Sequence, residues 1–219
     1  MRLQALLVSK ALKILVNHGL PPLKYEGLTV YRCPRVFPPG KLTKTSFLLA
    51  QTMILKENFE VLDVGCGTGF LSLVAARKAK RVVAVDVNPE ALKCTLRNVK
   101  ANGLEGKVEV RRGSLFEALK PEEKFDLIVA NLPYLPGQPR SLLEAGWLDD
   151  GSLMVKLLRE AGGRLKPGGF LQTVYSSLGS LTRQEIVGEA ETSGLSLLER
   201  RTFKSFLETF DVYTFTLKV

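Results

Sequence analysis

Apolar segments of strand length alternate with amphipathic segments of helix length from residue 57 to residue 194. This alternation, with strands that are apolar throughout, is typical of a parallel sheet covered by helices on both faces. The link between the last two segments is too short for a crossover, so they must pair antiparallel. The sequence therefore predicts an α/β fold: a Rossmann-like, seven-stranded, mostly parallel sheet with a C-terminal antiparallel hairpin. The expected strands are 60–64, 81–87, 107–113, 125–131, 170–177, 195–203 and 209–218, and the expected helices are 69–79, 89–103, 152–165 and 180–193, with a helical turn around 114–119.

The first 56 residues do not join this alternation. The start of the chain is typical of an amphipathic helix rather than a signal peptide, because Lys10 and Lys13 interrupt its apolar run. Gly19 and the Pro21-Pro22 pair end that helix. The expected units are an N-terminal extension packed on the core, residues 1–42, made of this helix and an extended segment at 28–40, and a domain, residues 43–219, which opens with a helix at 43–55.

The net charge of +9 is concentrated in the N-terminal part of the chain. Residues 1–56 hold nine Lys and Arg side chains against the single acid Glu26, whereas the remaining residues are nearly neutral. A basic stretch of this kind can attract an anionic partner such as RNA. It can equally be a solvated surface without a dedicated partner.

Composition excludes several classes of protein and of site. Ordinary Gly and Pro counts and 45% hydrophobic residues exclude a collagen-like or mostly disordered chain. No run of about 18 apolar residues exists, so no membrane association is expected. Cys33, Cys66 and Cys94 are far apart and form no CxxC pair, so we expect neither a disulfide framework nor a zinc site. His18 is the only histidine, no metal site is expected, and the cysteine usage favours a reducing, cytoplasmic location.

A glycine-rich loop follows the first strand of the alternation. Asp63, Gly65, Gly67 and Gly69 lie directly between an expected strand and an expected helix, where ligands bind in such folds. Glycine lets the backbone turn tightly and approach a ligand closely. The spacing is G-x-G-x-G, not the G-x-G-x-x-G of dinucleotide-binding loops. A loop led by a carboxylate suits a cationic, phosphate-free ligand such as S-adenosylmethionine, with Asp63 near the ammonium group of that ligand.

An acid also ends the second strand of the alternation. Asp86 lies where a carboxylate can accept hydrogen bonds from two ribose hydroxyls. This feature is common to proteins that bind NAD and proteins that bind S-adenosylmethionine. An NAD-dependent oxidoreductase is therefore an alternative, disfavoured by the glycine spacing.

The tetrapeptide Asn131-Leu132-Pro133-Tyr134 follows the fourth strand. Pro133 holds the preceding backbone extended. The Asn131 side-chain oxygen and the Leu132 carbonyl can then accept both hydrogen bonds of a planar –NH2 group, such as a carboxamide or the amine of adenine. Holding both N–H bonds favours charge developing on the nitrogen during attack. Tyr134 is expected to pack on the planar group, and the alternative is a plain turn after a strand.

These motifs together resemble class I S-adenosylmethionine-dependent methyltransferases. Within that superfamily the chain is most similar to the HemK-related release-factor glutamine methyltransferases of the archaeal and eukaryotic branch. The resemblance covers roughly residues 36–219. The closer match is carried by FLLA (47–50), GSLFEAL (113–119), LKPGGFLQTVYSSL (165–178), Gly194 and FKSFLETFDVY (203–213).

The resemblance implies methyl transfer to the glutamine in the Gly-Gly-Gln loop of a translation release factor. It also implies a partner, a small zinc-binding activator subunit shared by several translation methyltransferases. By position, Asp63 and the three loop glycines would line the methionine end of S-adenosylmethionine, Asp86 would bind the ribose, and Ser114 would lie near adenine. Asn131 and Pro133 would hold the acceptor nitrogen, with Tyr134 beside them.

The chain departs from the family pattern at several positions. Leu132 replaces the first proline of Asn-Pro-Pro-Tyr, Ser114 replaces an aspartate, and an aspartate usual near Thr45 is missing. Asn-Leu-Pro-Tyr also occurs in ribosomal RNA adenine dimethylases, so N6-adenine methylation of RNA is an alternative activity. A binding module without catalysis is a further alternative, opposed by the retention of every loop glycine, Asp86 and Asn131.

Overall fold

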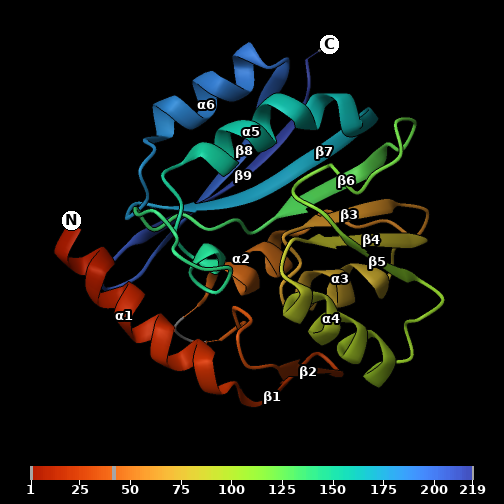
Figure 1. Ribbon diagram of the computed structural model, residues 1–219. Coiled ribbons are helices and arrows are strands. Elements are labelled where there is room, and N and C mark those ends of the chain that lie inside the picture. Colours follow the sequence, from red (N-terminus) through yellow and green to blue (C-terminus); the bar gives the residue numbers. More distant parts are fainter. Residues whose placement is uncertain (1, 41–42, 219) are drawn as a thin grey trace.

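A seven-stranded sheet forms the centre of the computed structural model, which describes residues 2–40 and 43–218 (Figure 1). The spatial order of its strands is β5-β4-β3-β6-β7-β9-β8. The strands β3 to β7 are parallel, and β9 pairs antiparallel with both β7 and β8. The prediction of a mostly parallel sheet with a C-terminal hairpin is confirmed. The bounds are β3 (Glu60–Val64), β4 (Arg81–Asp86), β5 (Val108–Arg112), β6 (Phe125–Ala130), β7 (Leu165–Ser176), β8 (Leu195–Lys204) and β9 (Thr209–Leu217).

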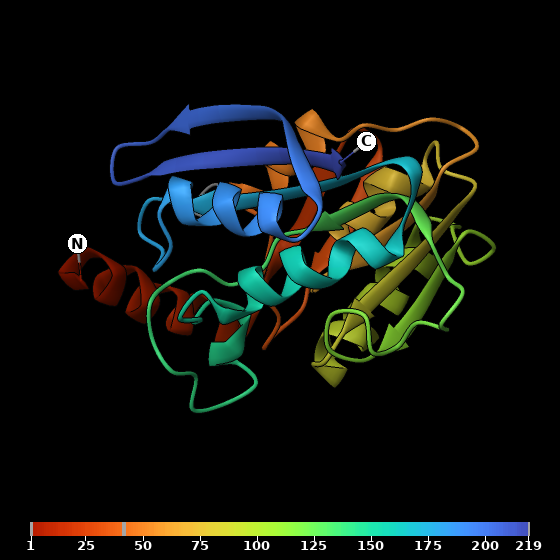
Figure 2. The same cartoon turned by 90° about the horizontal axis from the view of Figure 1, so that it is seen from above.

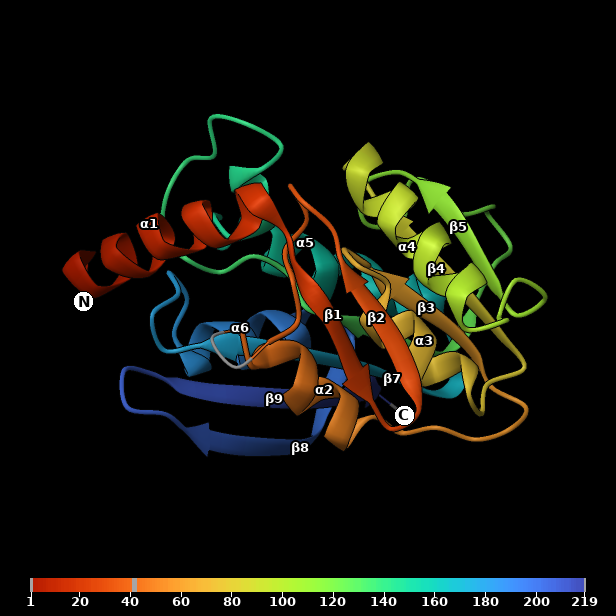
Figure 3. The same ribbon diagram turned by 90° about the horizontal axis from the view of Figure 1, so that it is seen from below.

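Helices cover both faces of the sheet, because successive side chains of each buried strand point to opposite faces. Val61 of β3 packs in the core under α3, whereas Leu62 packs in the core under α5. Figure 2 shows α5 and α6 on one face, and Figure 3 shows α2, α3 and α4 on the other. The bounds are α2 (Thr45–Thr52), α3 (Phe70–Ala76), α4 (Pro89–Ala101), α5 (Ser152–Ala161) and α6 (Arg183–Thr192), with short 3-10 helices η1 (Glu144–Gly146) and η2 (Gly162–Arg164).

Two helix starts follow directly from their sequences. Asn88 caps α4 by accepting a hydrogen bond from the Glu90 backbone at 3.0 Å, and Pro89 occupies the first turn, where no backbone N–H is needed. Thr182 and Glu185 form a reciprocal capping box at the start of α6. Both helices therefore begin at the residue whose side chain caps their first backbone N–H groups.

The N-terminal part contains an element that the sequence pattern did not reveal. After α1 (Arg2–His18), strands β1 (Leu20–Tyr25) and β2 (Leu28–Arg32) form an antiparallel hairpin, where only an extended segment at 28–40 is expected. The two prolines of β1 are tolerated because β1 pairs on one side only. Side chains of α4 hold β2 in place: Asn98 accepts a hydrogen bond from Tyr31 N at 2.7 Å, and Asn102 accepts one from Thr29 N at 2.9 Å.

A disulfide bond joins Cys33 to Cys94. The expectation that the cysteines form no disulfide was wrong. The two residues are 61 positions apart in the sequence, and only the packing of β2 on α4 brings their Cα atoms to 5.9 Å. Cys66 is a buried free thiol in the glycine loop.

Other differences are local. The segment 114–119 forms turns instead of a regular helix, α2 ends at Thr52, and β7 begins at Leu165, before the Gly168-Gly169 turn expected to precede it. Within residues 2–40 and 43–218, no helix is long and apolar enough to cross a membrane. The same residues contain no cluster of three or more His, Cys, Asp or Glu side chains with the spacing of a metal site.

Candidate active site

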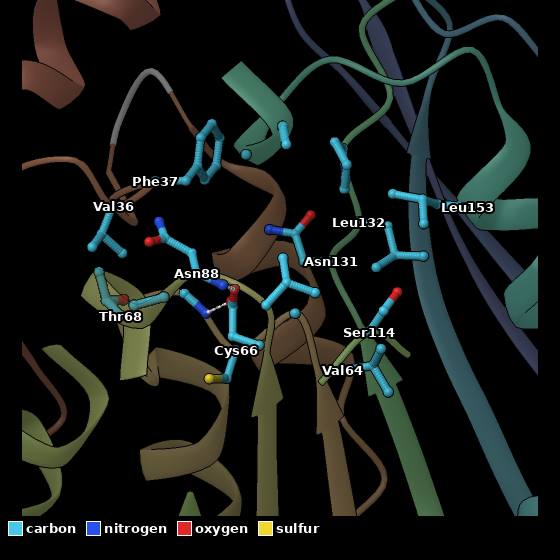
Figure 4. A pocket seen from close by; sticks show the side chains of 18 of the residues that line it. Val36, Phe37, Val64, Cys66, Thr68, Asn88, Ser114, Asn131, Leu132 and Leu153 are labelled. Carbon is cyan, nitrogen blue, oxygen red and sulfur yellow. Dashed lines mark hydrogen bonds between the residues drawn. The ribbon is translucent and has the colours of Figure 1, made fainter. Parts of the chain in front are cut away.

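A cavity opens at the carboxyl ends of β3, β4 and β6. Gly65 follows β3, Asp86 ends β4 and Asn131 follows β6, and all three line it. The cavity is open to solvent, and together with its mouth it takes in about 1000 Å³ of space between the described atoms. Figure 4 shows the side chains of Asn131, Ser114 and Phe37 around this space. Because β6 pairs directly with β3, the topology brings together residues that are far apart in the sequence.

The glycine loop forms the floor of the cavity. Gly65 and Gly67 have φ angles of 71° and 56°, a region that favours glycine. The loop is tied to the neighbouring strand, because the amides of Gly65 and Cys66 both donate to the Val85 carbonyl, at 2.8 and 3.0 Å. The backbone therefore faces the cavity without a Cβ atom in the way at Gly65 and Gly67.

Asp86 is fixed by two backbone amides. Gly67 N donates to its Oδ2 at 2.9 Å, and Asn88 N donates to its Oδ1 at 2.8 Å. Burial raises the pKa of this carboxyl, while the same amide bonds lower it. Each carboxylate oxygen retains further acceptor capacity toward the cavity, which suits a pair of ribose hydroxyls.

Asp63 lies beneath the glycine loop and does not line the cavity. Its side chain is fully buried, and the Ser72 hydroxyl donates to its Oδ2 at 2.5 Å. Burial raises the pKa of this carboxyl to about 7. Gly69 also lies behind the cavity wall, where it precedes α3 with a φ of 76° and leaves room for Thr95. The structure therefore places these two residues one layer behind the loop whose shape they support.

Asn131 is held by a residue that the sequence analysis did not identify. Its side-chain Nδ2 donates to Ser46 Oγ at 2.9 Å. Ser46 lies in the first turn of α2, is 8% exposed and also lines the cavity. The bond engages the amide nitrogen, so the Asn131 Oδ1 atom is left to accept hydrogen bonds from a ligand. No hydrogen bond to this oxygen comes from the residues that the structure describes.

A smaller hollow, which we name the side slot, adjoins the cavity. The residues that line only the side slot are Leu12, Tyr134, Leu135 and Trp147. The residues that line both hollows are Phe37, Asn131, Leu132, Pro133 and Gly146. Burial raises the pKa of the Tyr134 hydroxyl, so this side chain is neutral at ordinary pH. Its ring packs edge-on against Tyr175 at 6.1 Å between centroids. The slot is thus a small, mostly apolar and aromatic hollow beside Asn131.

Most of the predicted site residues gather at these two hollows. Gly65, Gly67, Asp86, Ser114, Asn131 and Pro133 line the cavity, and Tyr134 lines the side slot. Sequence reasoning missed Ser46, Phe37 and Leu12. No local pattern marks the last two, since they reach the site only through the folding of the N-terminal part over the sheet. Trp147 both lines the slot and anchors its loop, because its Nε1 donates to Ser9 Oγ at 2.9 Å.

The sequence matches the family model described as "methyltransferase small domain" over residues 27–192. A protein of Methanocaldococcus jannaschii, provisionally named a protein N5-glutamine methyltransferase, is 32% identical over 78% of this chain and 83% of its own length. Ribosomal RNA small subunit methyltransferase C of Escherichia coli is 36% identical over 69% of this chain. The match spans only 41% of the length of that second relative.

Solved structures share the fold at low sequence identity. The tRNA m1G37 methyltransferase of M. jannaschii superposes with a TM-score of 0.69 at 20% identity, covering 93% of this chain and 58% of the other. A methyltransferase from Pyrococcus furiosus superposes with a TM-score of 0.63 at 22% identity, and the match covers 98% of this chain and 97% of the other. The chain therefore belongs to the methyltransferase small domain family and is a class I S-adenosylmethionine-dependent methyltransferase.

Proposed function

We propose that this enzyme methylates N5 of the glutamine in the Gly-Gly-Gln loop of a translation release factor. The observation that carries the proposal is the fixed amide of Asn131, whose Nδ2 is engaged by Ser46 at 2.9 Å. Its Oδ1, together with the Leu132 carbonyl, offers two acceptors for a planar –NH2 group. The small apolar slot adjoins the cavity beside this pair, where a single side chain presented by a protein surface would meet the two acceptors.

The cavity fits S-adenosylmethionine on structural grounds. Gly65 and Gly67 present backbone without a Cβ atom, Asp86 presents a carboxylate that two amides hold, and Ser114 lines the opposite part of the wall. We propose that these residues and Asn131 contact the cofactor, with Asp63 and Gly69 supporting the loop from behind. When bound, the cofactor supplies an electrophilic methyl group.

The protein residues then act by orientation and by charge stabilisation. Asn131 and the Leu132 carbonyl hold both N–H bonds of the acceptor, which aims the nitrogen at the methyl group. As positive charge develops on that nitrogen, the two oxygens would stabilise it. The methyl carbon would exchange its bond to the sulfur of the cofactor for the bond to nitrogen, and the N–H proton that it replaces would pass to solvent at the open cavity. Pro133 keeps the backbone of the pair extended, and Tyr134 packs beside the planar group.

Glutamine as acceptor is supported by the M. jannaschii relative, which matches along most of both chains. We further propose a cytoplasmic location and a small zinc-binding activator subunit, on the family resemblance of the sequence. Methylation of N6 of adenine in RNA is the second candidate. It is favoured by the basic N-terminal residues and by the similarity to a ribosomal RNA methyltransferase.

Transfer of labelled methyl groups distinguishes the two candidates. Purified release factor and purified ribosomal or transfer RNA serve as separate acceptors, each with the wild-type enzyme and with Asn131→Ala. We expect label in the release factor only, lost when its Gly-Gly-Gln glutamine is replaced. We expect no transfer by Asn131→Ala, although this substitution should weaken cofactor binding in calorimetry far less than Asp86→Ala. Label in adenine of RNA would replace the proposal with the second candidate.

A further inference from the structure

Helix α1 forms part of the side slot, although it precedes the segment that the family model matches. Leu12 of α1 lines the slot beside Tyr134. Two polar contacts fix the helix to the loop that closes the slot: Trp147 Nε1 donates to Ser9 Oγ at 2.9 Å, and Lys13 pairs with Glu144, also at 2.9 Å. A macromolecule that brings its acceptor group to Asn131 past the slot would therefore meet α1.

The opposite face of α1 carries apolar side chains that the described protein does not cover. Leu7 is 59% exposed and Ile14 is 70% exposed, and Ala11 between them is exposed as well. Positions i, i+4 and i+7 lie on one side of a helix, so these residues form a single stripe. We name it the outer stripe. A helix is about 10 Å across, so the outer stripe lies about that distance from the slot.

The charge of α1 indicates what kind of surface fits there. The helix contains no Asp or Glu. Lys10, one position from Ala11, is exposed at the side of the outer stripe, and no ion pair engages it among the described residues. An apolar stripe bordered by a lysine is complementary to a protein surface with apolar and acidic side chains. It fits RNA poorly, since stacking platforms are absent from the stripe.

We propose that the outer stripe docks the protein acceptor of the enzyme, through a patch of apolar and acidic side chains near the methylated glutamine. This inference builds on the proposed function, and it adds the surface that selects the acceptor. The outer stripe lines neither hollow, so it contributes to recognition of the acceptor protein and not to the transfer step.

The test uses the full chain with the double substitution Leu7→Ser and Ile14→Ser. The matched control is Leu96→Ser with Leu198→Ser, two residues of similar exposure that line neither hollow. Labelled methyl transfer is measured into purified release factor, into a short peptide containing its glutamine loop, and into extract after nuclease or protease treatment. Circular dichroism and cofactor calorimetry show that each variant folds and binds S-adenosylmethionine.

We expect the outer-stripe variant to raise KM for the intact release factor about tenfold, with kcat and transfer to the peptide unchanged. Lys10→Glu should raise KM in the same way, and the effect should weaken with salt. The control variant should match the wild type. Self-association is checked by sedimentation, because loss of a dimer in the outer-stripe variant would assign this face to a second copy and overturn the docking role.

The remaining outcomes separate the two proposals. Label in another protein, reduced by the outer-stripe substitutions, would support the docking surface and refute the release factor as acceptor. Label in the release factor with an unchanged KM would refute the docking surface alone. Label that appears only in nuclease-sensitive material would refute both.

Discussion

The side-chain nitrogen of Asn131 lies 2.9 Å from the hydroxyl oxygen of Ser46, and this bond joins the end of β6 to the first turn of α2. The two residues are 85 positions apart in the sequence. Ser46 is in turn held against the core through its neighbour Phe47, whose ring packs on Phe70 at 5.3 Å and on Tyr25 of β1 at 5.6 Å. The orientation of the proposed acceptor clamp therefore depends on packing by the N-terminal hairpin.

Replacing Ser46 with alanine should slow transfer without weakening cofactor binding. A lost neutral hydrogen bond corresponds to about 1 kcal/mol, or roughly a fivefold fall in kcat. Steady-state transfer and calorimetry measure the two quantities. In the Asn131→Ala background the same substitution should have no further effect on residual transfer, since the amide that it positions is gone. Additive losses would show that Ser46 acts separately from Asn131.

Asp86→Ala should weaken S-adenosylmethionine binding by about tenfold or more, because hydrogen bonds to a charged group contribute on the order of 1.5–3 kcal/mol. The substitution also frees the amides of Gly67 and Asn88, which the carboxylate fixes. Asp86→Asn keeps one acceptor oxygen, so its affinity for S-adenosylmethionine should lie between those of the wild type and Asp86→Ala. Titration calorimetry measures the affinities, and an unchanged Kd for Asp86→Ala would contradict ribose binding at this residue.

The pH dependence of stability should reveal the buried carboxyl of Asp63. Burial raises its folded-state pKa to about 7, whereas an unfolded aspartate titrates near pH ~3.9. Between these values the folded state binds more protons, so this group lowers the free energy of unfolding as pH rises toward 7. Asp63→Asn cannot ionise. Urea unfolding at pH 5 and pH 8 should show the variant gaining stability relative to the wild type at the higher pH, and a constant difference would contradict this assignment.

Reduction of the Cys33–Cys94 disulfide should destabilise the folded chain. A cross-link that spans 61 positions lowers the conformational entropy of the unfolded chain, and this raises the free energy of unfolding by about 4 kcal/mol. Thermal unfolding with and without a reductant measures the effect. The reductant should lower Tm for the wild type and leave Cys33→Ser unchanged, because that variant has already lost the bond. An equal response in both proteins would place the effect of the reductant elsewhere.

The parts of the fold that were predictable depend on local patterns. The strand around Asp63, the glycine loop and the Asn131 tetrapeptide lie within short segments whose apolar runs and glycine spacing specify them. Their meeting at one edge of the sheet follows from the rule that parallel strands end on the same side. The cavity at the carboxyl ends of β3, β4 and β6 could therefore be outlined from the sequence.

The parts that were missed depend on contacts between distant segments. The β1–β2 hairpin contains prolines in a strand, and its position is fixed by Asn98 and Asn102 of α4. The disulfide, the Ser46 contact with Asn131, and the walls that Leu12 and Phe37 provide all follow from that packing. No spacing within the N-terminal segment encodes them, because their partners lie elsewhere in the chain.

Phe37 borders both the cavity and the side slot, and so do Leu132, Pro133 and Gly146. The two hollows thus share a partition made of a few side chains. An occupant of one hollow that moved this partition would alter the space in the other, so that binding in the two hollows would be coupled, and equally so in both directions.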